Sequence, residues 1–201
     1  MDWTEQELID FESRIASLFN AGKIRAPIHL YSGNEKELIE VFRTVQDQDW
    51  VFCSWRSHYQ CLLKGVPPED LESAIIQGRS ISLCFPKFRI FSSAIVGGHL
   101  PIAVGVSLQI KREDSDEHVW VFLGDMTAET GMAQTCIRFS EAWDLPITFV
   151  VEDNGVSVLT ETRKVWSTQT LRFEETNSNK VKFYKYSNIY PHAGAGKRVQ
   201  F

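Results

Sequence analysis

Two continuous apolar runs, separated by the length of one helix, constrain the fold of this chain more than any other feature. The runs cover residues 119–123 (VWVFL) and 145–151 (LPITFVV), and residues 127–143 between them have a helical pattern. Uninterrupted apolar runs of this kind are typical of strands buried on both faces of a parallel sheet. Parallel neighbours need a crossover connection, which is right-handed in nearly all proteins. The sequence therefore predicts an α/β fold with a three-layer, doubly wound parallel sheet.

The helices expected upstream of this unit include residues 2–20 and 97–110. In residues 2–20, Leu8, Phe11 and Ile15 recur at helical spacing with charged residues between them. Residues 97–110 are apolar nearly all round and rich in glycine. Such a helix is either buried inside the monomer or forms a contact surface for a second copy or a partner.

The composition argues against several functional classes. The 201 residues include 21 basic and 26 acidic side chains, a formal net charge of −5. Nothing in this balance favours nucleic acid or an anionic membrane as the main partner. No uncharged apolar run approaches the roughly 18 residues of a membrane span. The acidic start of the sequence lacks the features of a signal peptide, so we expect a cytoplasmic protein.

The cysteines do not predict a metal site. Cys53, Cys61, Cys84 and Cys136 include no pair in CxxC spacing. This spacing argues against zinc, and in a reducing cytoplasm we expect free, buried thiols.

The character of the chain changes after Trp166. A polar, turn-rich stretch is followed by residues 181–186 (VKFYKY), which alternate like a half-exposed strand, and by a glycine-rich end (YPHAGAGKRVQF). We expect one main domain over residues 1–166 and a C-terminal tail or small hairpin over residues 167–201.

Oxygen-bearing side chains follow the two apolar runs. Asp125 comes after the first run and Asn154 after the second, 29 residues further on. Ligands bind open parallel sheets outside the carboxyl ends of the strands, and carboxylate and amide oxygens suit Mg²⁺. A helix that begins near Thr127 would favour an anion there, which suggests a magnesium-bridged phosphate or diphosphate. In the other interpretation, Asp125 caps that helix and Asn154 belongs to an ordinary turn.

At these residues the sequence resembles a known family. The segments GDMTAETG (124–131) and EDNGVSV (152–158), with the spacing between them, look like the thiamine diphosphate motif. SWRSH (54–58) and SAIVGGHLPIAVG (93–105) extend the likeness. The chain resembles the diphosphate-binding part of the alpha subunit of 2-oxoacid dehydrogenase E1 components, in the transketolase-like superfamily, over about residues 27–166.

The resemblance implies a set of site residues. Magnesium would be held by Asp125, Asn154 and the backbone carbonyl of Val156. His58 and His192 would be catalytic, His58 by its matched position and His192 as a substitute for a loop histidine that the chain lacks. Thiamine diphosphate would contact Trp55, Arg56, Ala94, Val96, Gly124, Asp125, Met126, Thr127, Asn154 and Val158.

Three departures from the family pattern are visible. Met126 stands where the motif has a glycine, Asp153 where it has its first asparagine, and Ser82 where a histidine is often found. After Trp166 the family continues with a long histidine-bearing loop, which this chain replaces with a different segment.

The implied activity needs a second polypeptide. An alpha-type subunit would decarboxylate a 2-oxo acid, or cleave a ketose, and transfer the acyl or aldehyde unit. A beta-type subunit would supply the pyrimidine-binding domain and an activating glutamate, in an α2β2 assembly that a lipoyl-carrier protein could serve. Two alternatives stay open. One is a split-subunit transketolase-like carboligase, and the other is a non-catalytic subunit that keeps only the fold.

Overall fold

The computed structural model describes residues 3–197 and divides into two compact units. The first unit contains the described residues before 48, residues 55–94 and those from 187 onward. The second unit contains residues 48–54 and 95–186. Residues 1–2 and 198–201, the outer ends of two segments considered above, lie outside the described residues. Each unit is described by itself.

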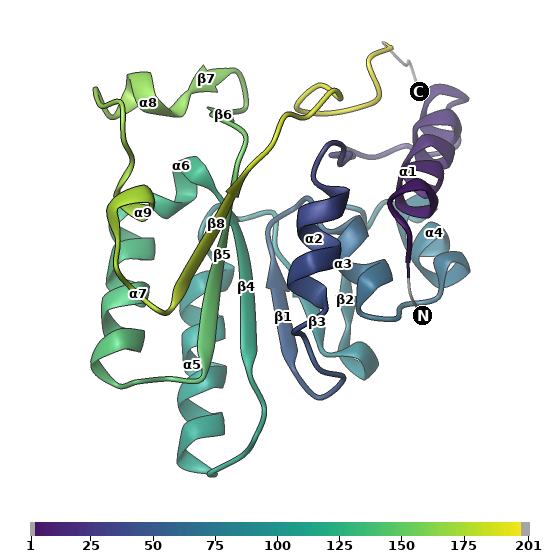
Figure 1. Ribbon diagram of the computed structural model, residues 1–201. Coiled ribbons are helices and arrows are strands. Elements are labelled where there is room, and N and C mark those ends of the chain that lie inside the picture. Colours follow the sequence, from purple (N-terminus) through teal and green to yellow (C-terminus); the bar gives the residue numbers. More distant parts are fainter. Residues whose placement is uncertain (1–2, 198–201) are drawn as a thin grey trace. The chain divides into compact units, whose positions relative to one another are not determined.

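The second unit contains a parallel sheet (Figure 1). Its strands, in spatial order, are β1 (Trp50–Cys53), β4 (Val119–Gly124), β5 (Ile147–Asp153) and β8 (Val181–Lys185). All three pairings are parallel. Every residue of β5 and all but the last of β4 are buried, as expected for strands covered on both faces. The α/β fold with a parallel sheet is therefore confirmed.

Helices and a small hairpin complete the second unit. They are α5 (His99–Arg112), α6 (Asp125–Ala128), α7 (Gly131–Ala142), α8 (Thr162–Val165), α9 (Arg172–Glu175) and the antiparallel pair β6 (Val156–Ser157) and β7 (Thr160–Glu161). Helix α5 packs on β1, β4 and α7.

One helical prediction needs correction. The single helix expected over 127–143 is two helices, because the Thr130 side chain caps a new one by accepting a hydrogen bond from the Ala133 amide at 3.3 Å. Helix α5, expected to be buried in the monomer or to form a contact surface, buries Leu100, Ala103 and Ile110 but leaves Ile102 49% exposed. Gly105 has only open space beside it in this chain.

The C-terminal segment divides between the two units. The expected strand is β8, but it pairs in parallel with β5 rather than in a hairpin. Residues from 187 onward belong to the first unit, where the Gly194 amide donates to the Ile28 carbonyl at 2.9 Å. The boundary expected at residue 166 does not coincide with either unit.

The first unit is mainly helical. Its elements are α1 (Glu5–Asn20), α2 (Glu35–Phe42), α3 (His58–Leu63), α4 (Pro68–Ile76), the short 3-10 helix η1 (Pro86–Phe88) and the antiparallel pair β2 (Cys84–Phe85) and β3 (Ile90–Ser92). A capping box between Thr4 and Glu7 starts α1. The helix buries the expected face, which contains Leu8, Phe11 and Ile15.

Two further predictions can be compared with the described residues. No helix within residues 3–197 is both long and apolar enough to cross a membrane. The four cysteines are free, and three are buried, but Cys84 is exposed, contrary to expectation.

Candidate functional site

The predicted metal ligands lie at the carboxyl ends of two neighbouring strands. Strands β4 and β5 pair in parallel, with Gly124 opposite Glu152 at the end of the register. Asp125 follows directly as the first residue of α6, and Asn154 comes two residues after Glu152. Helix α6 packs against β5 and β6, the hairpin strand that contains Val156. The adjacency on which the magnesium hypothesis depends is therefore present.

Asp125 has the properties of a group that needs a cation. It is only 2% exposed, and its Oδ2 atom has no hydrogen-bond partner among the described residues. Burial raises the pKa of Asp125 to about 6, and the nearby charge of Asp153 acts in the same direction. A buried carboxylate with an unsatisfied oxygen is costly unless a positive charge compensates it. The cap of α6 is Gly124, so the alternative of Asp125 as a cap residue does not hold.

Asn154 begins a loop whose backbone is unusual. Its Oδ1 atom accepts a hydrogen bond from the Val156 amide at 3.1 Å, and Gly155 has φ of +78°. Val158 has φ of +58°, which is rare for a β-branched residue, and it is 53% exposed. Strained backbone of this kind gathers at functional sites.

The remaining predicted residues of the second unit lie around α6. A Cβ added to Gly124 would meet nothing within 4 Å, so open space adjoins the strand end. Thr127 is buried and Met126 is half-buried. A Cβ on Gly97 would lie 3.8 Å from Thr127 Cγ2, which places the turn after Val96 beside α6. Val96 itself is 59% exposed.

In the first unit, Trp55 and Arg56 present unsatisfied donors. Trp55 Nε1 and Arg56 Nε are both buried and have no acceptor among residues 3–197. The Arg56 guanidinium lies over the Tyr31 ring, 5.8 Å from its centroid. Two adjacent buried N–H groups without acceptors suit an anion such as a diphosphate. Ala94, also expected to contact the cofactor, is exposed at the end of its segment of this unit.

His58 is held on both sides by protein groups. Its ring is fully buried, with Nδ1 2.8 Å from Glu12 Oε2 and Nε2 2.9 Å from Ser80 Oγ. The catalytic role expected from the resemblance needs a ring nitrogen that reaches the substrate. Both nitrogens are engaged here, so this arrangement favours a structural role for His58.

His192 lies in an aromatic group with His29 and Trp55. Its ring centroid is 4.7 Å from that of His29 and 6.2 Å from that of Trp55. The backbone carbonyl of His192 also accepts a hydrogen bond from His29 Nδ1. Burial lowers the pKa of His29 to about 4, and burial together with the Arg56 charge lowers the pKa of His192. Both shifts favour the neutral form of the rings.

Sequence reasoning missed three residues of these groups. Glu12 lies on the buried face of α1 beside Leu8 and Ile15, and a charge on an apolar face was the available signal. His29 gave no local signal, because its contact with the His192 carbonyl joins residues distant in sequence. Arg163, whose guanidinium donates to Asp153, gave none because a loop separates the two residues.

The metal hypothesis needs ligands from outside this chain. Within residues 3–197, no group of three or more His, Cys, Asp or Glu side chains could hold a metal ion. Asp125 is the single acidic member of the predicted set, and Mg²⁺ commonly takes its other ligands from phosphate oxygens and water.

Comparisons with known proteins give a matching family model and several relatives. The family model for the dehydrogenase E1 component matches residues 4–174. The chain is 27% identical over 167 residues to the alpha subunit of acetoin:2,6-dichlorophenolindophenol oxidoreductase from Bacillus subtilis, covering 76% of this chain and 50% of that protein. It is 29% identical over 167 residues to the pyruvate dehydrogenase E1 alpha subunit of Porphyra purpurea, covering 72% and 47%. The chain thus spans about half the length of the curated relatives it matches.

Proposed function

The chain belongs to the dehydrogenase E1 component family, and from that premise we propose that it is the alpha-type subunit of a thiamine diphosphate-dependent 2-oxoacid dehydrogenase. The two relatives described above are named for acetoin and for pyruvate, which makes pyruvate the first 2-oxo acid to test. The observation that carries the proposal is the buried Asp125 carboxylate, with an unsatisfied oxygen at the carboxyl end of the sheet.

The described residues fit the cofactor. When bound, thiamine diphosphate would supply the nucleophilic carbon and the electron sink for decarboxylation. Asp125, Asn154 and the Val156 carbonyl would hold Mg²⁺, and the unsatisfied Trp55 and Arg56 donors would bind diphosphate oxygens.

Other residues would contact the cofactor. Gly124, Met126 and Thr127 would approach the diphosphate through α6, and Val158 would support the cofactor from its exposed loop. The Ala94 carbonyl and the Val96 amide would hold the pyrimidine. His192 would transfer protons in the reaction.

A beta-type partner would complete the enzyme. Residues 156–166 include five exposed apolar side chains, those of Val156, Val158, Leu159, Val165 and Trp166. Exposed apolar side chains that gather in one segment are typical of an interaction surface. We assign this surface and the exposed face of α5 to the partner or to a second copy, in a cytoplasmic α2β2 assembly.

Calorimetry tests the proposal. Thiamine diphosphate is titrated into the full chain with Mg²⁺, with and without a beta-type E1 subunit. We expect magnesium-dependent binding that is lost in Asp125→Asn. Absence of binding in both conditions would support the non-catalytic alternative instead. Turnover of pyruvate with a lipoyl acceptor, rather than an aldehyde or sugar acceptor, would separate the dehydrogenase from the carboligase.

A further inference from the structure

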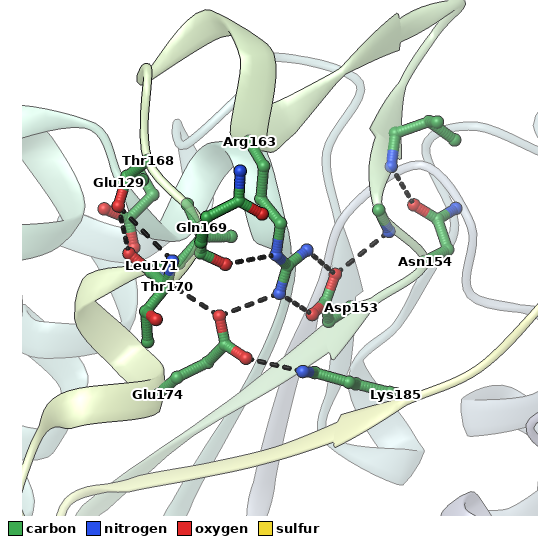
Figure 2. A network of polar contacts seen from close by, with 12 residues as sticks. Glu129, Asp153, Asn154, Arg163, Thr168, Gln169, Thr170, Leu171, Glu174 and Lys185 are labelled. Atoms are coloured by element: carbon green, nitrogen blue, oxygen red, sulfur yellow. Dashed lines mark hydrogen bonds and ion pairs between the residues drawn. The ribbon is translucent and has the colours of Figure 1, made fainter.

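An ion pair closes the base of the loop that carries two proposed magnesium ligands. This loop covers residues 154–162, from the end of β5 to the first residue of α8. Asp153 precedes it and Arg163 follows it. Arg163 Nη2 donates to Asp153 Oδ2 at 2.9 Å, and Nη1 donates to Oδ1 at 3.3 Å (Figure 2). The side chains at the two ends of the loop therefore hold each other.

The Arg163 guanidinium is fixed by further acceptors. Nη2 also donates to Glu174 Oε2 at 2.7 Å, and Nε donates to the Gln169 carbonyl at 3.1 Å. The other oxygen of Glu174 pairs with Lys185 of β8 at 2.6 Å (Figure 2). Arg163 is thus anchored to α9 as well as to the end of β5, and its side chain is only 26% exposed. A planar guanidinium held at several points is a rigid connector.

Asp153 uses its oxygens for the loop. It is 2% exposed, and besides Arg163 its Oδ1 atom accepts from the Gly155 amide at 2.9 Å. These contacts explain why an aspartate occupies a place where the resembling motif has asparagine. A carboxylate can form an ion pair with Arg163 and accept hydrogen bonds through both oxygens, whereas a neutral amide cannot.

Backbone hydrogen bonds within the loop also hold it, and two of its residues have unusual backbone conformations. Gly155 and Val158 have positive φ values, and the tip residues Val158 and Leu159 are 53% and 89% exposed. The loop is closed inside by the hairpin β6–β7 and by the Thr162 amide, which donates to the Gly155 carbonyl at 3.0 Å. Unfavourable backbone conformations persist only where the surroundings enforce them.

We propose that Arg163 is a positioning residue for the metal centre, which holds Asn154 and the Val156 carbonyl in place by tying both ends of their loop to α9. The role in metal binding rests on the proposed function. The closure of the loop does not, because it follows from the contacts of this chain alone.

Two measurements on the full chain test the role of Arg163. Hydrogen exchange followed by mass spectrometry reports the order of residues 154–162. Electron paramagnetic resonance reports Mn²⁺ binding in the presence of thiamine diphosphate. In Arg163→Gln we expect exchange in this loop to rise about tenfold or more and the Mn²⁺ dissociation constant to rise about tenfold. Arg163→Lys keeps the charge but not the planar guanidinium, so its loop exchange and Mn²⁺ dissociation constant should lie between those of Arg163→Gln and wild type.

A matched control lies in the same network. Lys185 pairs with Glu174 through a side chain that is 61% exposed, and it lies opposite Asp153 in the backbone register of β5 and β8. Lys185→Gln should therefore leave both measurements within twofold of wild type. In the double variant Asp153→Asn with Arg163→Gln, loop exchange and the Mn²⁺ dissociation constant should rise no more than in Arg163→Gln alone, because the two residues act as one pair.

The outcomes separate this inference from the proposed function. If exchange in residues 154–162 of Arg163→Gln is unchanged, the positioning role of Arg163 is overturned. An equal rise in exchange across β4 also overturns it, because such a rise marks general destabilisation. If the wild-type chain binds no Mn²⁺, the proposed function and the metal role of Arg163 fail together, while the exchange comparison still decides loop closure. If the wild type binds Mn²⁺ and Arg163→Gln binds it equally well, the positioning role alone fails.

Discussion

Gly124 of β4 lies opposite Glu152 of β5 in the last pair of their parallel register. The residues that follow this pair along the chain, Asp125 and Asp153, are both acidic, but their surroundings differ. Asp153 is paired with Arg163, whereas Asp125 has a buried oxygen without a partner among the described residues. The structure thus neutralises one carboxylate within the chain and leaves the other for a ligand.

The first prediction concerns Asp125. Asp125→Asn should weaken magnesium-dependent binding of thiamine diphosphate about a hundredfold or more, because the charged metal ligand is lost. The melting temperature should not fall, since a neutral amide removes the cost of a buried, unpaired charge. Calorimetry and thermal unfolding measure the two effects.

Asp116→Asn is the matched control, because Asp116 is exposed. It should change neither quantity. Retention of tight binding in Asp125→Asn would remove this residue from the metal site.

The second prediction concerns the unsatisfied donors of the first unit. Arg56→Gln should weaken binding of inorganic pyrophosphate by about 1.5–3 kcal/mol, the usual contribution of a hydrogen bond to a charged group. Trp55→Phe should weaken it less, because only one neutral donor is removed. Titration calorimetry at low salt measures both.

Arg43→Gln serves as the comparison, since Arg43 pairs with Glu40 and is 68% exposed. Its pyrophosphate affinity should match wild type after correction for net charge. Equal weakening in Arg43→Gln and Arg56→Gln would mean that only general charge matters.

The third prediction separates the two histidines that the sequence marked as catalytic. In the reconstituted enzyme, His192→Gln should lower kcat about a hundredfold while cofactor affinity stays within twofold, as expected for lost proton transfer. Steady-state kinetics and calorimetry measure this difference.

His58→Gln should behave in the opposite way. It disrupts the contact with the buried Glu12 carboxylate and should cost about 1–3 kcal/mol of unfolding free energy. If His192→Gln instead destabilises the chain and leaves kcat unchanged, His192 only fastens the C-terminal segment.

The fourth prediction is a pH dependence of stability. His99 is 1% exposed, its Nε2 atom donates to the Phe122 carbonyl at 3.0 Å, and burial lowers its pKa to about 4. Between about pH 6.5 and pH 4 the unfolded chain binds a proton that the folded chain does not. The unfolding free energy therefore falls on acidification through this range, by about 2 kcal/mol between pH 7.5 and pH 5 from His99. His29 acts in the same direction.

Urea unfolding at several pH values measures this effect. His99→Gln keeps an N–H donor for the Phe122 carbonyl but does not titrate, so its stability should depend less on pH. An identical pH dependence in wild type and His99→Gln would contradict the assignment.

The sequence predicted the centre of the fold because its signals there are local. The apolar runs around Val121 and Phe149 identify buried strands, and their pairing follows from the short crossover. The partner of β8 could not be predicted, because parallel pairing with β5 depends on contacts between distant segments. The break between α6 and α7 was missed because the cap at Thr130 lies within an otherwise helical pattern.

The candidate site was predictable only in part, for the same reason. Asp125 and Asn154 follow strand ends and were visible from spacing. The acceptors around His58 come from Glu12 and Ser80, 46 and 22 residues away, and no periodicity indicates them. The pairing of Asp153 with Arg163 depends on how the intervening loop folds back.

Anomalous scattering from crystals of the full chain grown with Mn²⁺ and thiamine diphosphate tests the central claim most directly. The account predicts one strong manganese peak within about 2.0–2.3 Å of oxygens from Asp125, Asn154 and the Val156 backbone, with the diphosphate completing the coordination. A manganese peak elsewhere, or diphosphate bound with no metal near Asp125, would contradict it.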